Sequence, residues 1–400
     1  MRAQVIRHPP ICDGSLLMTY YNKQHSDACA DFFVCDEAHL LYTKVIPNTR
    51  CCKETMAMPA FNFFKNRTGK FPLFRILLPV LLCLFLLSGC TQPFKRSAPL
   101  EAAGFYFDTV ISVRIYSNAK DSEEILEQCM ALAQHYENLF SPNVEGSDIW
   151  NINHSGGGYV PVSEDTLTLL HTALDYAALS DGLVDPTVGA LSRLWNFGSG
   201  NQEIIPEREA IDSALLHVDY RFVEIKGGEV RLTDPEARLE LGFIAKGFIG
   251  DKMKEYLISR NISSALINLG GNVVALGSRP DGIPFQVGIR NPFGEAGEPL
   301  LVLDASDISI VSSGNYERFF DKDGRRYHHI LSTETGEPAE SGLAQVTILS
   351  SGSASADALS TLCFILGYER AVSFLEAYPE VQAVFVTTEG EILYANMPGN

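Results

Sequence analysis

The chain has 400 residues, of which 46% are hydrophobic and 20% are charged. This balance excludes collagen, a coiled coil and a polar linker, and the length is sufficient for a substantial hydrophobic core. The charge divides unevenly, because residues 1–90 carry a net charge of +4 and residues 91–400 a net charge of −22. Nucleic-acid binding requires Lys and Arg to neutralise phosphates, so the acidic part is unsuited to it. A phosphate-containing ligand would need local positive charge, for which a divalent metal ion is the obvious source.

An apolar run marks the boundary between the two charge regions. Four basic residues between positions 65 and 75 precede twelve uncharged, mostly apolar residues, 76–87. This length is typical of a signal-peptide core and is shorter than the roughly 20 residues of a membrane-spanning helix. We therefore predict a signal peptide over 58–90. Its end, Leu87-Ser88-Gly89-Cys90, resembles a bacterial lipobox, which makes Cys90 the expected lipidation site. An ordinary signal peptide or a buried helix ending in Cys is the alternative.

Residues 1–57 are unusual ahead of a signal peptide. They contain five of the nine cysteines and show no clear helical or strand period. We interpret them as an unstructured or wrongly assigned extension, with translation beginning at Met56 or Met58; a genuine N-terminal extension is the alternative. Beyond Cys90 the chain holds only Cys129 and Cys363, so a disulfide framework is not expected despite export.

Downstream we expect a tether over 91–103, rich in Pro, Ser and Ala, and then one α+β body over 104–400. Alternation predicts a strand over 105–116, and helical periodicity predicts helices over 121–139 and 163–179, the second capped by Ser163. A hairpin over 218–233 is expected to turn at Gly227-Gly228. The remaining expected elements are a helix over 245–260, strands over 265–268, 273–276, 285–289, 300–303, 308–311, 327–331 and 344–349, helices over 355–366 and 369–377, and two short final strands.

The pair Asp357 and Thr361 is the most informative local pattern. The two residues are four apart on a predicted helix, so their side chains share one face. A carboxylate and a hydroxyl are oxygen ligands suited to Mg²⁺, which takes few protein ligands and completes its shell with water and phosphate oxygens. The alternative is that Asp357 complements the helix N-terminus and Thr361 is solvated.

Three other segments contain candidate residues, each with a plain structural alternative. The Gly-rich stretch 241–248 ends a strand and opens a helix, where amides attract phosphate, but it lacks the spacing of a Walker or dinucleotide motif. Asp185 is expected to cap a helix that has Pro186 at its first position. His328 and His329 are neighbours in a strand and therefore point to opposite faces, so one of them faces inward, as a general base or as a structural residue.

Several segments form a specific set when they are taken together in chain order. They are Phe107-Asp108-Thr109, 147–153, 180–189 with Trp195, Phe197 and Gly198 behind it, 242–248, 268–271, 288–292, 313–318 and 356–361. As a set they resemble the ApbE-type flavin transferases, the family of FAD:protein FMN transferases. The resemblance covers residues 104–397.

The resemblance implies a fold and an activity. The fold would be a two-lobed body with mixed sheets flanked by helices and a ligand cleft between the lobes. In that cleft the family binds FAD, places Mg²⁺ on the pyrophosphate and moves FMN onto a Thr or Ser hydroxyl of an acceptor protein, releasing AMP. The implied partners are extracytoplasmic redox-complex subunits as acceptors and the membrane, through the lipid anchor, with no nucleic acid. The implied location is the extracytoplasmic face of the cell membrane.

The resemblance also implies roles for particular residues. Asp357 and Thr361 match the metal ligands, joined by a main-chain carbonyl that we assign to Phe243, with Ala245 as the alternative. The residues that match FAD-binding positions are Asp185, Lys246, Ser147, Asn153 and His329. His329 is also the candidate base for the acceptor hydroxyl.

One segment departs from the family pattern. The family commonly follows its His-Ile segment with Asp-Pro, whereas here Ile330-Leu331 is followed by Ser332-Thr333. Loss of that carboxylate puts the orientation of His329 in question. Two alternatives to a transferase therefore stay open, an FAD pyrophosphatase giving FMN and AMP and a non-catalytic FAD-binding lipoprotein. A solute-binding lipoprotein unrelated to the family would have no need for Asp357 and Thr361 together.

Overall fold

The computed structural model describes residues 4–6, 98–116, 121–198, 203–295 and 297–397. The predicted signal peptide, Cys90 and most of the extension and the tether lie outside these residues. Residues 4–6 of the extension form strand β1 (Gln4–Ile6), which pairs antiparallel with β2 (Leu100–Tyr106). Strand β2 begins at Leu100, a few residues before the predicted boundary at 104. None of the helices in the described ranges is both long and apolar enough to cross a membrane.

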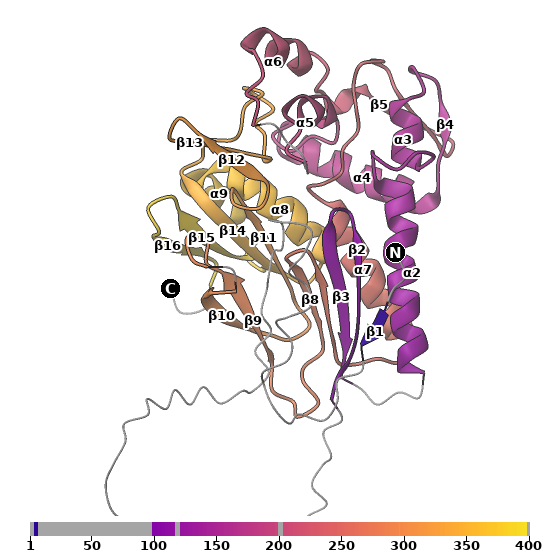
Figure 1. The fold of residues 1–400 in the computed structure, drawn as a ribbon, viewed down its shortest axis with the longest axis vertical. Helices are drawn as coiled ribbons and strands as arrows, with labels where there is room; N and C mark the ends of the chain where they lie inside the picture. The colour runs from indigo at the N-terminus through magenta and orange to yellow at the C-terminus, as the bar shows by residue number, and fades with distance from the viewer. Residues whose placement is uncertain (1–3, 7–97, 117–120, 199–202, 296, 398–400) are drawn as a thin grey trace, which may run out of the picture. The chain divides into compact units, whose positions relative to one another are not determined.

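The centre of the body is a nine-stranded sheet (Figure 1). Its strands in spatial order are β1, β2, β3 (Thr109–Ile115), β7 (Ala265–Leu269), β8 (Asn272–Leu276), β11 (Ser309–Gly314), β14 (Leu343–Ser350), β15 (Gln382–Thr387) and β16 (Ile392–Ala395). Every pairing between these named strands is antiparallel, where mixed sheets were expected.

Helices cover one face of the sheet, and a hairpin covers part of the other. Alternate residues of one strand separate the two faces: Ile267 of β7 packs with helices α2 (Ser122–Phe140) and α7 (Ala245–Ser259), whereas Leu266 packs with the hairpin of β9 (Phe285–Arg290) and β10 (Pro299–Ala305). Helices α8 (Ser353–Leu366) and α9 (Tyr368–Leu375) share a core with β14 and β15. This period-two division is what an antiparallel sheet buried on both faces requires.

A second group of small elements packs near the functional site. It consists of α5 (Gly189–Trp195), α6 (Arg208–Leu215), β12 (Phe319–Lys322) and β13 (Arg325–His328). Its aromatic core stacks Trp195 on Phe197 and on Tyr327, with ring centroids 5.6 and 5.8 Å apart. The remaining elements are α3 (Asp148–Asn153), β4 (Val160–Pro161), α4 (Glu164–Leu179), a 3₁₀ turn (Tyr220–Phe222), β5 (Val223–Lys226) and β6 (Glu229–Leu232).

Most sequence predictions agree with these elements. Ser163 caps α4 by accepting a hydrogen bond from the Thr166 amide, and β5 and β6 turn at Gly227-Gly228 as expected. The strand predicted over 105–116 is wrong, because β2 and β3 form a hairpin whose turn residues Phe107 and Asp108 both have positive φ. The alternation of apolar and polar residues continues through both strands of the hairpin, so the pattern did not reveal the turn.

The predicted helix start at Asp185 is also wrong. Helix α5 begins at Gly189 with Val188 as its N-cap, three residues later than expected. Cys129 and Cys363 are buried and free, in agreement with the expected absence of a disulfide between them.

Candidate active site

A cavity in the body brings together six of the predicted site residues. They are Asp185, Phe243, Lys246, His329, Asp357 and Thr361, which come from distant parts of the chain. One set of lining residues, which we call the helical wall, lies at the start of α7 and along α8 and consists of Phe243, Lys246, Asp357, Thr361 and Ile365. A second set, which we call the loop wall, consists of residues 183–185, Val188 and residues 329–331 and 333.

The helical wall depends on close contact between α7 and α8. A Cβ atom on Gly247 would lie 2.2 Å from the carbonyl oxygen of Ser353, so only glycine permits this approach. The Gly247 amide donates to Asp357 Oδ2 at 2.8 Å, and Lys246 Nζ lies 4.0 Å from Asp357 Oδ1. Asp357 is only 3% exposed. Its carboxylate is therefore fixed in direction before any ligand binds.

A second carboxylate locks the two helices together. Asp251 on α7 accepts hydrogen bonds from the amides of Ser353 and Ala354, both at 2.8 Å, and so satisfies two of the unpaired donors at the N-terminus of α8. Burial raises the pKa of Asp251, although these two amide donors oppose that shift. Asp251 acts on the site through α8, which carries both Asp357 and Thr361.

The donor atoms on the helical wall fit a hard divalent cation. In a regular helix the Gly247 amide would donate to the Phe243 carbonyl four residues back, but here it donates to Asp357. The Phe243 carbonyl accepts no hydrogen bond from the described residues. Thr361 Oγ1 is 3.1 Å from the hydroxyl of Ser313. A free carbonyl, a carboxylate and a hydroxyl make the all-oxygen set that Mg²⁺ prefers. Ala245, the alternative carbonyl, is already inside α7.

This donor set differs from the side-chain clusters that hold transition metals. Within the part of the chain that the structure describes, no group of three or more His, Cys, Asp and Glu side chains is placed to bind a metal ion. A site with one carboxylate, one hydroxyl and one carbonyl does not depend on such a cluster, and it leaves coordination positions for ligand oxygens and water.

On the loop wall, Asp185 is held by the protein itself. Its Oδ1 accepts hydrogen bonds from the amide and the hydroxyl of Thr187 at 2.7 and 2.6 Å, and its Oδ2 accepts from the Tyr220 amide at 2.7 Å. Burial raises the pKa of Asp185, and these hydrogen bonds oppose the shift. Asp185 thus shapes a rigid turn at the cavity. A direct FAD contact for it remains a prediction.

The two adjacent histidines point to opposite faces, as their position at the end of a strand predicts. His328 is buried, with Nε2 3.2 Å from the Ala339 carbonyl and its ring edge-on to Phe364. Burial lowers the pKa of His328 to about 4. His329 lines the cavity.

His329 has the properties of a proton acceptor. Its Nδ1 is buried without a hydrogen-bond partner, and its backbone amide is fixed by the Arg318 carbonyl at 3.1 Å. Burial, together with the positive charges of Arg318 and Lys246 and with His328, holds the pKa of His329 well below its ordinary value. The imidazole is therefore neutral at pH 7 and can accept a proton.

Two predicted binding residues do not line the cavity. Ser147 caps α3 by accepting from the Trp150 amide at 2.9 Å, and its hydroxyl donates to the Ser141 carbonyl at 2.6 Å. Asn153 exchanges two hydrogen bonds with the backbone of Leu239, next to the cavity residue Glu240. Both side chains support the structure around the site, and an FAD contact for either remains a prediction.

Sequence reasoning assigned no role to three residues that reach the site. Glu317 and Arg318 line the cavity, and Ser313 contacts both Thr361 and the hydroxyl of Ser360, the latter at 2.7 Å. Burial raises the pKa of Glu317, against the positive charges of Lys246 and Arg318. All three lie in the segment 313–318 that carried part of the resemblance. The signal was a charged pair that follows a buried strand after two intervening residues.

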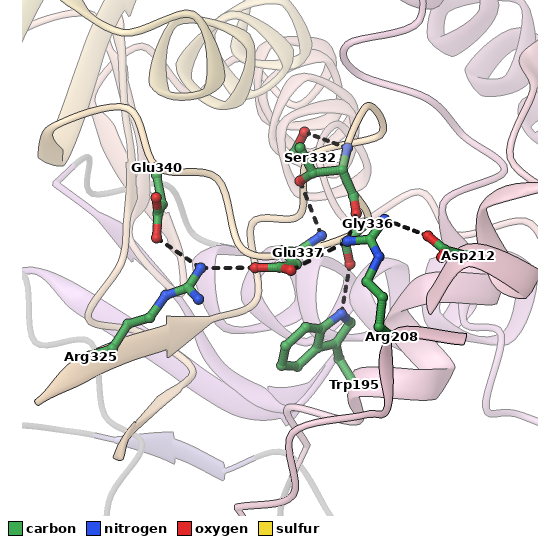
Figure 2. Close-up of polar contacts among 9 residues, drawn as sticks. Trp195, Arg208, Asp212, Arg325, Ser332, Gly336, Glu337 and Glu340 are labelled. Carbon is green, nitrogen blue, oxygen red and sulfur yellow. Dashed lines mark hydrogen bonds and ion pairs between the residues drawn. The ribbon is translucent and has the colours of Figure 1, made fainter. Parts of the chain in front are cut away.

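The loop that departs from the family pattern is tightly held (Figure 2). Trp195 Nε1 donates to the Gly336 carbonyl at 2.8 Å, and Arg208 reaches the Thr335 carbonyl at 3.2 Å. Glu337 lies between two arginines, 3.3 Å from Arg208 and 3.0 Å from Arg325. Residues 332–337 therefore have a fixed conformation without the Asp-Pro pair.

Comparison with known proteins identifies the family of this chain. A family model described as the ApbE family matches residues 107–385. The chain belongs to the ApbE family. A FAD:protein FMN transferase from Treponema pallidum is 36% identical over 325 residues, which cover 77% of this chain and 90% of that protein. Another, from Klebsiella pneumoniae, is 32% identical over 289 residues, covering 72% and 88%.

Solved structures of ApbE proteins are also similar to this structure. The ApbE protein from Thermotoga maritima is 30% identical with a TM-score of 0.69, and the flavin transferase ApbE from Vibrio cholerae is 25% identical with a TM-score of 0.67. In both cases the match covers 74% of this chain and 97% of the other. These similarities confirm the predicted family, the α+β fold class and the enzyme class, flavin transferase.

Proposed function

We propose that this ApbE-family enzyme transfers FMN from FAD to a Thr or Ser hydroxyl of an acceptor protein in a Mg²⁺-dependent reaction that releases AMP. The observation that carries the proposal is one cavity that is lined by Asp357, Thr361 and Phe243 together with Lys246 and His329. In the family pattern these residues correspond to the metal ligands, the phosphate contact and the base.

The charges of the site suit a pyrophosphate ligand. Lys246 is the cation of the helical wall, and it stands at the start of α7, where the helix dipole also favours anions. Mg²⁺ held by Asp357, Thr361 and the Phe243 carbonyl would neutralise phosphate charge that builds up during transfer. Local positive charge of this kind explains how a protein part with a net charge of −22 can hold a polyanionic substrate.

The transfer step requires only one proton acceptor from the protein. The acceptor hydroxyl oxygen forms a bond to the phosphorus of the FMN half, and the bond from that phosphorus to the bridging oxygen breaks, so that AMP leaves with the electron pair. Neutral His329 accepts the hydroxyl proton. Phosphoryl transfer depends mainly on alignment and charge neutralisation, which rigid walls supply.

The cellular setting follows from the N-terminal pattern. We propose that the protein is exported and anchored through a lipidated Cys90, because a basic flank, a twelve-residue apolar run and a lipobox-like end precede the enzyme body. Its acceptors are then extracytoplasmic redox-complex subunits. Radiolabelled palmitate incorporated by the wild type and lost in Cys90→Ala would support this, and equal labelling of both would refute it.

Mass spectrometry tests the proposed reaction. The full chain is incubated with FAD, Mg²⁺ and a candidate acceptor protein, with the acceptor's target Thr replaced by Val as the control. We expect the acceptor to gain one FMN and AMP to form in equal amount, with neither change in the control. AMP formed at the same rate without acceptor would instead identify an FAD pyrophosphatase. Bound FAD with no AMP at all would identify a non-catalytic flavin-binding protein.

A further inference from the structure

A single hydrogen bond joins two segments of the loop wall that are far apart in the sequence. Thr333 Oγ1 donates to the carbonyl oxygen of Gly182 at 2.8 Å, although the residues are 151 positions apart. Thr333 lines the cavity, and Gly182 immediately precedes the lining residues 183–185. The bond therefore connects the His329 side of the loop wall to the Asp185 side.

The Gly182 end of this bond belongs to the turn that fixes Asp185. Gly182 has a φ of +81°, and its amide donates to the Ala177 carbonyl at the end of α4. A Cβ atom at Gly182 would lie 3.9 Å from Asp185 Oδ2 and 3.8 Å from the Tyr220 ring. The carbonyl that accepts from Thr333 is thus part of the same compact turn as the Asp185 carboxylate.

The Thr333 end belongs to a loop that cannot easily shift. Ser332 Oγ accepts from the amides of Glu334 and Thr335, each at 3.2 Å, and the Ser332 amide donates to the Glu337 carbonyl at 2.8 Å. The contacts to Trp195 and the two arginines hold the outer side of this loop (Figure 2). Because the loop is fixed, the direction of the Thr333 hydroxyl is fixed as well.

We propose that Thr333 is a positioning residue that sets the spacing between His329 and the Asp185 turn and so keeps the cavity ready to bind FAD. In this chain Ser332 and Thr333 orient the loop. Ser332 forms its turn, and Thr333 attaches the loop to the segment that contains Gly182. The proposal rests on the proposed function, because FAD is the ligand whose binding would report the spacing.

The test compares two substitutions at one position. Thr333→Val keeps the shape and removes the donor, and Thr333→Ser keeps the donor. One neutral hydrogen bond corresponds to a change of about 2- to 10-fold in binding. We expect Thr333→Val to raise the KM and the Kd for FAD by about 3- to 10-fold with little change in kcat, and Thr333→Ser to restore both to within about twofold of wild type.

Thr335→Val is the matched control. It removes a hydroxyl from the same loop, where Thr335 Oγ1 accepts only from the Glu337 amide at 3.3 Å, and it leaves the backbone carbonyl that binds Arg208. Its FAD affinity should equal that of the wild type. An unchanged Kd in Thr333→Val, or an equal loss in Thr333→Ser or Thr335→Val, would overturn the proposal.

The readouts separate this proposal from the proposed function. The Kd for FAD is measured with Mg²⁺ and without acceptor, by quenching of flavin fluorescence. A wild type that binds FAD but transfers no FMN would overturn the function and leave the Thr333 comparison decisive. A wild type that binds no FAD would overturn both. If Thr333→Val does not fold, Thr333→Ala replaces it as the variant that lacks the hydroxyl.

Discussion

The two walls of the cavity are built in different ways. The helical wall depends on backbone contact between α7 and α8, where Gly247 lies against Ser353 and Asp251 caps α8. The loop wall consists of loop segments that are joined by hydrogen bonds such as Thr333 to Gly182. Close packing of helices tolerates little displacement, whereas single hydrogen bonds of a polar loop can be removed separately. The proposed metal ligands lie on the first wall, and the candidate base lies on the second.

The largest effect is expected at the loop wall, from His329→Gln. Removal of a general base lowers the rate by about 10²- to 10⁴-fold, and a separate FAD titration is needed because His329 also matches an FAD-binding position. Single-turnover measurements of FMN transfer, paired with FAD titration, check this. A rate within tenfold of wild type would show that another group takes the proton.

Acid should weaken the structure around His328, the last residue of β13. The pKa of His328 is lowered to about 4, so between pH 6.5 and 4 the unfolded chain binds a proton that the folded chain does not. Stability contributed by the neutral form is therefore lost as pH falls through this range, by about 1.4 kcal/mol per pH unit. Urea unfolding of wild type and His328→Gln at several pH values tests this. An equal loss of unfolding free energy with falling pH in both proteins would contradict this expectation.

Gly247→Ala should break the helical wall. The new Cβ would meet the Ser353 carbonyl at 2.2 Å, and overpacking of this kind lowers the free energy of unfolding by about 1–3 kcal/mol. Gly250→Ala is the control, because it gains the same helix propensity but meets only side-chain atoms, at 3.0 Å or more. Equal unfolding midpoints for the two variants would show that α7 and α8 can separate without strain.

A smaller effect is expected from Asp251→Asn. The amide keeps one acceptor oxygen but loses the charge at the start of α8, which lowers the free energy of unfolding by about 1 kcal/mol. Asp175→Asn, on the exposed side of α4, should leave stability unchanged. We also expect the Mg²⁺ concentration for half-maximal transfer to rise a few-fold in Asp251→Asn alone. The same stability and the same Mg²⁺ requirement in the two variants would show that Asp251 does not support the site.

The sequence was most informative where the pattern was periodic. The helices that carry Lys246 and Asp357 were predicted within two residues of their bounds, because apolar periodicity and caps are local signals. Asp357 and Thr361 could be paired from their spacing alone. Their proximity to Lys246 could not be predicted, because it depends on the close contact of Gly247 with a helix about 100 residues further along the chain.

The loop wall shows why the rest could not be predicted. Local sequence suggested that Asp185 caps a helix, yet its carboxylate binds Thr187 and Tyr220 in a turn that tertiary packing creates. Ser332-Thr333 looked like a loss relative to the family pattern, since the acceptor of the Thr333 hydroxyl is 151 residues away. Contacts of this range leave no periodic signal in a single sequence.

The Mg²⁺ dependence of FMN transfer, measured in wild type and in Asp357→Asn, tests the central claim most directly. Asparagine can still accept the Gly247 hydrogen bond, so the fold should be kept while the charged metal ligand is lost. We predict that a chelator abolishes transfer by the wild type, that Mg²⁺ restores it, and that Asp357→Asn needs at least about 100-fold more Mg²⁺. Transfer that survives the chelator, or the same Mg²⁺ dependence in both proteins, would contradict the account.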